Sequence, residues 1–424
     1  MIYWLIGYMF LFIDRPFEVW PVLGSWRIER VYMIGLLVAW LLFAHPKRWI
    51  GNRLQSSFLL FWISVLLSAV ASPYRSPAQE QVIDLYVKTV VFYLVMTTCG
   101  LGAFTLRRLI VGYTFVIGLY MTHSYTEYLH GRHEYRMGIP RMVGVGETYS
   151  DPNTFAATLV YSLPLSFAIW KLCTRRWHRI LLVYYIVLTV VCVLKTGSRS
   201  GFFALAICGL VALPRLRGHK WIFCLIILAI PFSWQVLPPN LQDRFRTIWD
   251  SSYGPETARE SAEGRTQGFK DGLKLWFRNP LIGNGPGSHG QALGHGMQSH
   301  NLYGQVLGEL GSLGALAFGS IVAGFYLNAL EARSLAKRYP LLQGSFEAAV
   351  ACVIPLSILL LLVKGWADHN LFRYTWLWFG SFQSMALHAL RQQAVALEET
   401  FLRSDDNESL EEGQNLNPVV EYTR

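Results

Sequence analysis

Apolar runs repeat along almost the whole chain, and they constrain the fold more than any other feature. Several are shorter than the roughly 20 residues that a transmembrane helix needs, and these must include flanking residues. Each spanning segment must be helical, because lipid cannot satisfy the polar groups of an open sheet. The predicted fold class is therefore all-α, a polytopic integral membrane helical bundle of about 12 transmembrane helices. The predicted spans lie near residues 1–13, 31–44, 57–72, 84–99, 107–122, 154–170, 180–195, 201–214, 221–237, 301–329, 345–363 and 371–390.

The composition agrees with a membrane protein. Hydrophobic residues make up 53% of the 424 residues and charged residues only 15%, whereas a soluble domain carries roughly a quarter charged residues. The formal net charge is +10, which in a soluble protein would suggest a nucleic-acid partner. Here Lys and Arg lie in short loops between apolar runs. The charge therefore indicates orientation in a lipid bilayer, and no nucleic-acid partner is expected.

The cysteines and the N-terminus exclude two other classes. The six cysteines lie in or at the ends of apolar runs and form no CxxC pair, so neither a disulfide framework nor a zinc site is expected. The run 1–13 lacks a basic n-region and a small-residue cleavage site. We interpret it as a retained first span.

The distribution of Lys and Arg predicts the topology. Alternate loops near residues 47–53, 107–108, 171–179, 215–220 and 333–338 are rich in these residues, and the positive-inside rule places them in the cytoplasm. Both termini then face the cytoplasm, whereas the two long segments, roughly 123–153 and 239–300, face outward. We expect residues 1–390 to form one transmembrane domain, and 391–424 to be a disordered cytoplasmic tail because it is polar from about Leu402 onward.

Three groups of candidate functional residues fall on the predicted outer face. The first is the turn 196–201, which reads Thr-Gly-Ser-Arg-Ser-Gly. Small residues allow close approach of a ligand, and the helix that follows begins with free N–H groups suited to an anion. Arg199 offers a planar fork that binds phosphate through two hydrogen bonds. The alternative is an ordinary tight turn whose Arg reaches the membrane interface.

The second group covers residues 264–287. Arg265 heads a stretch of helical spacing that ends near Arg278, and a loop follows that contains Gly285 and Gly287. The loop glycines either cradle a phosphate through backbone N–H groups or only shape a turn. The stretch is no Walker motif, because it has no GK[ST]. Arg265 is a candidate diphosphate ligand, and Arg278, Gly285 and Gly287 are secondary candidates.

The third group is His300-Asn301, where the 239–300 segment ends and the next apolar run begins. His is the side chain best suited to accept a proton near neutral pH, so these two residues are the catalytic candidates. The alternatives are a helix-capping polar pair and a hydrogen-bonded structural His. His289 and His295 lie nearby, but spacings of six and five residues without an interleaved carboxylate do not match metal ligands. No metal is predicted.

Weaker candidates lie in the remaining outer loops. The segment 151–153 reads Asp-Pro-Asn before a span, and a helix cap is the favoured interpretation. Asp368, in a short loop between Lys364 and Arg373, either lines the same site or pairs locally. The loop 123–153 also has a basic face that suits an anionic glycan or lipid head group, although a solvated loop is the simpler interpretation. That face consists of Arg132, Arg136 and Arg141.

Together these residues resemble the O-antigen ligase superfamily, which also includes bacterial polysaccharide polymerases and protein O-oligosaccharyltransferases. The resemblance is strongest from Asp151 to about residue 330. It rests on the turn around Arg199, on the stretch from 265 to 287, and on His300-Asn301 followed by Gly311 and Gly314. That spacing is similar to the family signature of a His, then Asn, Ser or Gln, then two glycines. The first 120 residues match only as generic spans.

The resemblance implies a membrane glycosyltransferase in the bacterial inner membrane, with its active site on the periplasmic side. Such enzymes move a glycan from an undecaprenyl-diphosphate carrier to an acceptor hydroxyl, on lipid A core or another glycan, without a metal, nucleotide or other cofactor. It further implies that Arg199 and Arg265 bind the lipid diphosphate and that His300 activates the acceptor hydroxyl. The expected partners are the lipid-linked donor, the glycan or lipid acceptor and the bilayer.

Three functions remain open at this point. A ligase would transfer a finished polymer, whereas a polymerase of the same superfamily would join repeat units on the carrier, and the two share donor and base. A transporter is the third alternative. It is disfavoured because the spans contain few charges, of which Lys88 is the main example, and a transport path usually needs more.

Overall fold

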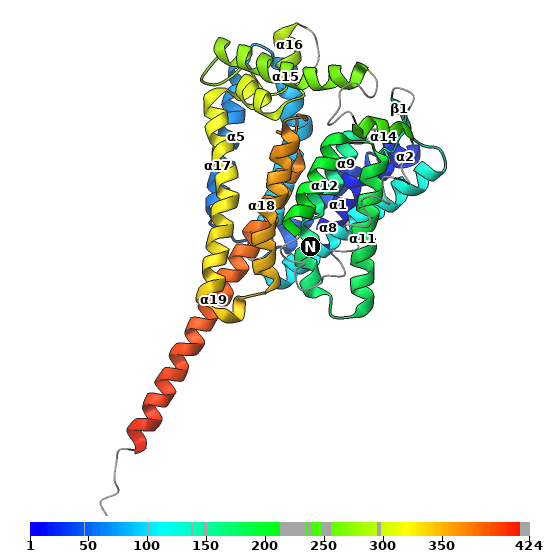
Figure 1. Cartoon of the computed structure of the whole chain (residues 1–424). Coiled ribbons are helices and arrows are strands. Elements are labelled where there is room, and N and C mark those ends of the chain that lie inside the picture. The colour runs from blue at the N-terminus through cyan, green and yellow to red at the C-terminus, as the bar shows by residue number, and fades with distance from the viewer. Residues whose placement is uncertain are drawn as a thin grey trace, which may run out of the picture.

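The computed structural model (Figure 1) describes the chain except residues 46, 100–101, 137–138, 147–150, 213–234, 236–238, 247–255, 295–297 and 416–424. The described part is almost entirely helical. Its longer helices are α1 (Ile2–Ile13), α4 (Ile28–Phe43), α5 (Arg53–Ala71), α7 (Val87–Thr98), α8 (Ala103–Leu129), α9 (Pro152–Ser162), α11 (Arg176–Lys195), α12 (Arg199–Ala212), α15 (Glu256–Arg278), α17 (Leu302–Arg338), α18 (Phe346–Gly365) and α19 (Tyr374–Asn415). Its short elements are α2 (Pro16–Val19), α3 (Pro21–Ser25), α6 (Arg75–Gln79), the π-helix η1 (Glu80–Tyr86), α10 (Leu165–Ile169), η2 (Trp170–Leu172), α14 (Pro239–Arg246), α16 (His289–Leu293), η4 (Pro340–Leu342), β1 (Glu134–Arg136) and β2 (Ile139–Arg141).

Helices long and apolar enough to cross a membrane dominate the described residues, as predicted. Seven continuous segments qualify, and α1 and α12 are shorter apolar helices. An all-α membrane protein is therefore confirmed, whereas the predicted count of about 12 spans stays a prediction. The predicted span 221–237 lies outside the described residues, apart from Gln235. The seven segments are Arg53–Ala71, Arg75–Thr98, Ala103–Leu129, Pro152–Leu172, Arg176–Lys195, Leu302–Arg338 and Phe346–Gly365.

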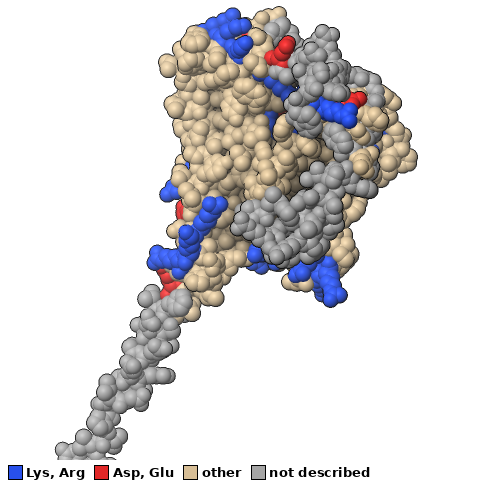
Figure 2. All heavy atoms as spheres, in the orientation of Figure 1, with Lys and Arg blue, Asp and Glu red and all other residues tan. Residues whose placement is uncertain are grey.

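The surface of the bundle is that of a lipid-facing protein. One face of α5 carries apolar side chains that are exposed, and Val70 is 83% exposed. In the space-filling view the surface over α17 is largely uncharged, with Lys and Arg gathered at its upper and lower ends (Figure 2). Exposed apolar surface of this extent is stable only against an apolar solvent. The exposed side chains of α5 include Leu59, Leu60, Ile63, Leu66, Leu67 and Val70.

Helix starts in the bundle are set by capping side chains. The carboxylate of Asp151 accepts a hydrogen bond from the backbone N–H of Thr154 at 2.8 Å, and Pro152 follows at the first helical position of α9. This confirms the predicted cap at 151–153. Ser345 caps α18 in the same way, accepting from the N–H of Ala348 at 3.2 Å.

The outer segments are more structured than the sequence pattern predicts. Helix α8 extends to Leu129, into the segment 123–153 that we predicted as a loop, because hydropathy marks the depth of the membrane and not the end of a helix. A small antiparallel hairpin follows, in which Glu134 pairs with Arg141. In the segment 239–300 the predicted helical stretch lies within α15, but α15 begins at Glu256, so the expectation that Arg265 heads the helix is wrong. Figure 1 shows α15 and α16 above the ends of α5 and α17.

The C-terminal segment also differs from the prediction. Helix α19 continues past residue 390 to Asn415 and leaves the body of the protein as a single long helix (Figure 1). Residues 391–415 of the predicted tail thus belong to α19, and the assignment of 391–424 to a separate cytoplasmic tail stays a prediction. The physical reason is local, since residues 389–402 are rich in Ala, Leu, Gln, Glu and Arg, which are strong helix formers.

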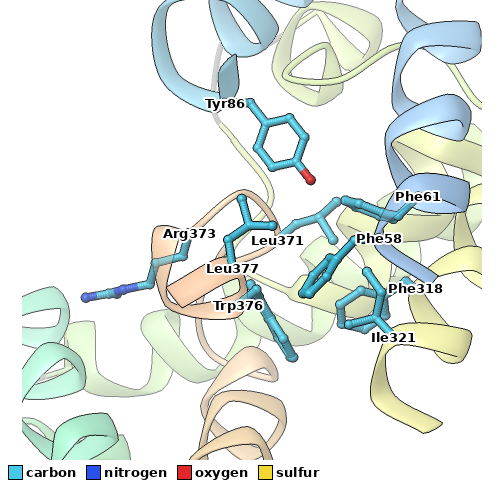
Figure 3. Close-up of a pocket in the computed structure, with 9 residues that line it drawn as sticks. All are labelled: Phe58, Phe61, Tyr86, Phe318, Ile321, Leu371, Arg373, Trp376 and Leu377. Atoms are coloured by element: carbon cyan, nitrogen blue, oxygen red, sulfur yellow. The ribbon is translucent and has the colours of Figure 1, made fainter. Parts of the chain in front are cut away.

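The core is packed by aromatic and aliphatic side chains from α5, η1, α17 and α19. They enclose an apolar cavity of about 10 Å³, which has room for about one water molecule at most. Figure 3 shows the rings of Phe58, Phe318 and Trp376 around it, whereas Arg373 points away from the rings. The guanidinium of Arg373 therefore lies on the opposite side of the segment 371–377 from this packed region (Figure 3).

Candidate active site

The structure brings most of the predicted site residues together at one end of the bundle. Arg199 is the first residue of α12, Arg265 lies on α15, His300 precedes α17, and Asp368 lies in the turn after α18. Mutual electrostatic effects place them near one another: the charge of Arg199 acts on Arg265, and the charges of Arg265 and Asp368 act on His300. Four segments that are distant in sequence thus form one cluster.

The turn before Arg199 is fixed by its own side chains. Gly197 adopts a left-handed conformation with φ 59°, which a residue with a Cβ rarely adopts. The N–H of Ser198 donates to the hydroxyl of Thr196 at 3.2 Å, and the hydroxyl of Ser198 accepts from the N–H of Gly201 at 3.2 Å. The first turn of α12, and with it Arg199, is therefore held in a defined orientation.

Arg141 supports this turn from the neighbouring segment. Its side chain is buried, and its Nε donates to the carbonyl of Thr196 at 2.6 Å, while a terminal nitrogen donates to Asn153 at 3.2 Å. The expectation of a solvated basic loop is therefore wrong for Arg141. Arg141 is the last residue of β2, and its contact with Thr196 joins β2 to the turn before α12.

Arg265 is half-buried on α15. Burial is the main cause of its lowered pKa; the charge of Arg199 lowers the pKa further, and Asp368 raises it. Two guanidiniums held close together repel each other, so their proximity costs free energy unless an anion lies between or near them. The pair is consequently suited to bind a phosphate group.

Close glycine contacts between α15 and α17 set the position of Arg265. A Cβ added to Gly272 would lie 2.3 Å from the Cα of Gly304, and one added to Gly304 would lie 2.5 Å from the carbonyl oxygen of Gly268. The two backbones are therefore in direct contact, which only glycine allows. This contact lies within one to two turns of both Arg265 and His300, and it fixes their separation.

His300 stands at the start of α17 with its ring partly exposed. Its ring centroid lies 5.7 Å from that of His369. Partial burial is the first cause that lowers the pKa of His300 from its ordinary 6.5; His369 and Arg265 lower it further, whereas Asp368 and Asp151 raise it. The net shift is downward, so the imidazole is neutral at pH 7 and able to accept a proton.

Asn301 is fully buried and acts as a structural junction. Its Oδ1 caps α17 by accepting from the N–H of Gly304 at 3.0 Å, and its Nδ2 donates to the carbonyls of Arg265 at 3.4 Å and Trp366 at 3.2 Å. The side chain thereby joins α15, α17 and the end of α18. These bonds match the capping alternative for Asn301 and make it a positioning residue for its two neighbours in the site.

Asp368 is one of two carboxylates that act on His300, the other being Asp151. Asp368 lies 3.8 Å from the guanidinium of Arg373 and 3.9 Å from the imidazole of His369, measured between the closest N and O atoms. Arg373 also donates to the carbonyl of Thr154 at 3.1 Å, so it ties Asp368 to α9. The sequence analysis identified Arg373 only as a neighbour of Asp368. The contacts of Arg373 with α9 could not be predicted from the spacing of residues along the sequence.

The secondary candidates Gly285 and Gly287 do not face this cluster. The N–H of Gly285 donates to the carbonyl of Glu309 at 2.9 Å, and that of Gly287 donates to the carboxylate of Glu309 at 2.9 Å. These donors are used within the protein, so the loop shapes a turn against α17 rather than a phosphate cradle. Glu309 lies two residues before a break in α17 at Gly311, where φ is 65°.

Arg278 also lies apart from the site. It donates to the carbonyl of Ala292 at 2.9 Å and joins α15 to α16. Along α15 it is 13 residues from Arg265, which corresponds to about 20 Å of helix. Arg278 therefore supports the outer helices and does not reach the same ligand as Arg265.

No group of three or more metal-ligating side chains is found among the described residues. Of the three histidines that a metal site would have used, His289 is buried in α16, His300 lies in the cluster, and His295 lies outside the described residues. The prediction of a metal-free site stays a prediction.

The fold and the cluster define a polytopic helical membrane protein with paired arginines and a histidine at one end of its bundle. Residues 184–319 match the family described as O-antigen ligase, which confirms the predicted resemblance to the O-antigen ligase superfamily over this part of the chain. The matched stretch contains Arg199, Arg265 and His300, and it ends before Asp368. No curated protein sequence matches the chain.

Proposed function

We propose that this protein is a metal-independent glycosyltransferase that moves a glycan from an undecaprenyl-diphosphate carrier to an acceptor hydroxyl. The reaction would take place at the periplasmic face of a bacterial inner membrane. The observation that carries the proposal is the convergence of Arg199, Arg265 and His300 from three separate segments. The match of residues 184–319 to the O-antigen ligase family supports the same reaction class.

The chemistry requires charge stabilisation at the donor. When the bond between the sugar C1 and the phosphate oxygen breaks, its electron pair stays on that oxygen and undecaprenyl diphosphate leaves with an additional negative charge. Arg199 and Arg265 stabilise this charge in the transition state through charge-assisted hydrogen bonds. Two fixed guanidiniums take the place that a divalent cation holds in many other glycosyltransferases.

The acceptor requires a base. His300 accepts the proton of the acceptor hydroxyl at a ring nitrogen as the acceptor oxygen forms its bond to C1 of the sugar. Asp368 lies close enough to His300 to favour the imidazolium that results, and this stabilises the transition state electrostatically. The proton, the glycan and the leaving group are thus each assigned to a named residue or product.

The acceptor distinguishes the two members of the proposed reaction class. A ligase acts on lipid A core or another surface glycan, whereas a polysaccharide polymerase acts on a second lipid-linked repeat unit. The charge cluster serves both, because the donor and the base are the same. We therefore propose the shared transfer step and leave the acceptor to the experiment.

The test is glycan transfer by the purified full-length protein in liposomes with undecaprenyl-diphosphate glycan, chelator and no nucleotide. Wild type is expected to transfer the glycan, and His300→Ala is expected to lose transfer while it still inserts and folds. Parallel reactions with lipid A core and with a second lipid-linked unit separate ligase from polymerase. Unchanged transfer by His300→Ala would rule out the catalytic base, and vesicle uptake of the glycan without a new glycosidic bond would favour a transporter.

A further inference from the structure

Lys364 is a buried cation near the C-terminal end of α18. Lys364 is only 1% exposed. The ammonium donates to the hydroxyl of Ser200 at 3.1 Å and to the carbonyl of Asn153 at 3.2 Å. Ser200 directly follows Arg199, and Asn153 lies in the first turn of α9. Lys364 therefore sits where α9, α12 and α18 pack against one another.

Both hydrogen-bond acceptors of Lys364 are neutral. Within the described part of the chain, no carboxylate oxygen lies within 4 Å of its ammonium nitrogen. Buried charges in proteins are usually paired, since an unpaired charge in a low-dielectric environment is destabilising. An ammonium also has three N–H donors, and two of them are used here. Among the described residues, the third donor has no hydrogen-bond partner, and the two carboxylates that act on the charge, Asp368 and Asp151, lie beyond 4 Å.

The charge balance around Lys364 points to an anion. The charged side chains that act on it are Asp368, Arg373, Asp151 and Arg265, and Arg199 acts on Arg265. Among the described residues, these are four cationic side chains, including Lys364, and two carboxylates. Arg141, which is buried and donates to Asn153 beside Lys364, adds a fifth cation. A diphosphate esterified at both ends carries one negative charge on each phosphate, so it would offset two of these positive charges.

We propose that Lys364 is a third diphosphate-binding residue, which donates its remaining N–H to a phosphate oxygen of the lipid carrier. The inference rests on the proposed function and extends it, because it assigns a direct ligand from α18 in addition to Arg199 and Arg265. The alternative is that Lys364 only ties α9 and α12 to α18. The two roles differ in what they require: direct binding requires the charge, whereas the tie requires the hydrogen bonds.

The experiment measures lipid binding rather than transfer. Purified full-length protein in nanodiscs is titrated with undecaprenyl diphosphate and, separately, with undecaprenyl phosphate. Wild type is expected to bind the diphosphate more tightly. Lys364→Gln keeps a donor but removes the charge, and it should weaken diphosphate binding on the order of tenfold and monophosphate binding less. The matched control Ser200→Ala removes one hydrogen bond of Lys364 and keeps the charge, so its affinity should change less than about threefold.

The outcomes separate the two proposals. Equal affinity of wild type and Lys364→Gln for the diphosphate, with a lowered melting temperature in the variant, would overturn the direct contact and leave only the tie. Failure of wild type to bind undecaprenyl diphosphate would overturn the proposed function itself. Should Lys364→Gln not fold, Lys364→Met replaces it. Because Met removes the hydrogen bonds as well as the charge, its affinity is compared with that of Ser200→Ala, which removes one of these bonds and keeps the charge.

Discussion

The side-chain amide of Asn301 donates to the carbonyl oxygen of Arg265 at 3.4 Å and so joins the residue next to His300 to α15. The same amide holds the carbonyl of Trp366 at 3.2 Å, at the end of α18. The side chain of Asn301 thereby links α15, which carries Arg265, to α17, which begins beside His300. The arrangement of Arg265 relative to His300 depends on this junction as well as on the contact between α15 and α17.

The first prediction concerns this junction. Asn301→Ser retains an N-cap hydroxyl for the N–H of Gly304 but loses the two hydrogen bonds of the side-chain amide. Asn301→Ala loses the cap as well as these two hydrogen bonds. Replacing an N-cap by Ala costs about 1 kcal/mol, so the Ala variant should have the lower melting temperature in detergent. Transfer should fall in both variants, because Arg265 loses its fixed position relative to His300. Full activity in Asn301→Ser would show that the cap alone matters.

The second prediction concerns pH. The pKa of His300 is lowered from 6.5 by burial first and then by His369 and Arg265. Since the neutral form is the base, kcat/KM should fall as the pH drops through this lowered pKa, so the acid limb should lie below pH 6.5. His369→Ala removes a lowering influence and should shift the limb to higher pH, whereas Asp368→Asn removes a raising influence and should shift it to lower pH.

The opposite signs of these two shifts are the control. A general loss of stability in either variant would lower the rate at every pH without moving the limb. The measurement is the initial rate of transfer between pH 5 and pH 8 at subsaturating donor. Shifts in the same direction for both variants would contradict the assignment of His300 as the titrating base.

How far the sequence could predict this molecule follows from the range of each interaction. Apolar runs report directly on membrane spans, so the helical membrane fold was predictable, and local motifs pointed to Arg199, Arg265 and His300. The burial of Arg141 and the contacts of Lys364 depend on tertiary packing between distant segments, which spacing does not reveal. The glycine contact did have a signal, since Gly268 and Gly272 on one segment and Gly304 and Gly308 on the other repeat every fourth residue, a spacing typical of closely packed membrane helices.

The third prediction separates the arginines of α15. Arg265→Gln should lower kcat/KM by about 100- to 1,000-fold, the usual loss when one donor to a developing negative charge is removed. Arg265→Lys should recover little of it, because an ammonium lacks the planar fork. Arg278→Gln is the matched control on the same helix and should stay within about twofold of wild type, since it lies about 20 Å from Arg265 along α15. Equal losses at both positions would mean that the helix acts only as a scaffold.

The last prediction tests the backbone contact between α15 and α17. A Cβ at Gly272 would lie 2.3 Å from the Cα of Gly304, whereas one at Gly264, on the same helix, would meet nothing within 4 Å. Gly272→Ala must therefore push the helices apart, at a cost of about 1–3 kcal/mol or more. Gly264→Ala should leave stability unchanged or raise it by up to about 1 kcal/mol, because Ala favours a helix over Gly.

Transfer activity adds information that stability alone does not give. Gly272 lies two turns from Arg265 on α15. A larger distance between α15 and α17 at Gly272 therefore moves the guanidinium of Arg265 away from His300. Gly272→Ala should therefore reduce kcat at saturating donor even in preparations selected for folded protein by size-exclusion chromatography, and Gly264→Ala should not. If folded Gly272→Ala transferred glycan at the wild-type rate, the spacing between α15 and α17 would not control the geometry of the site.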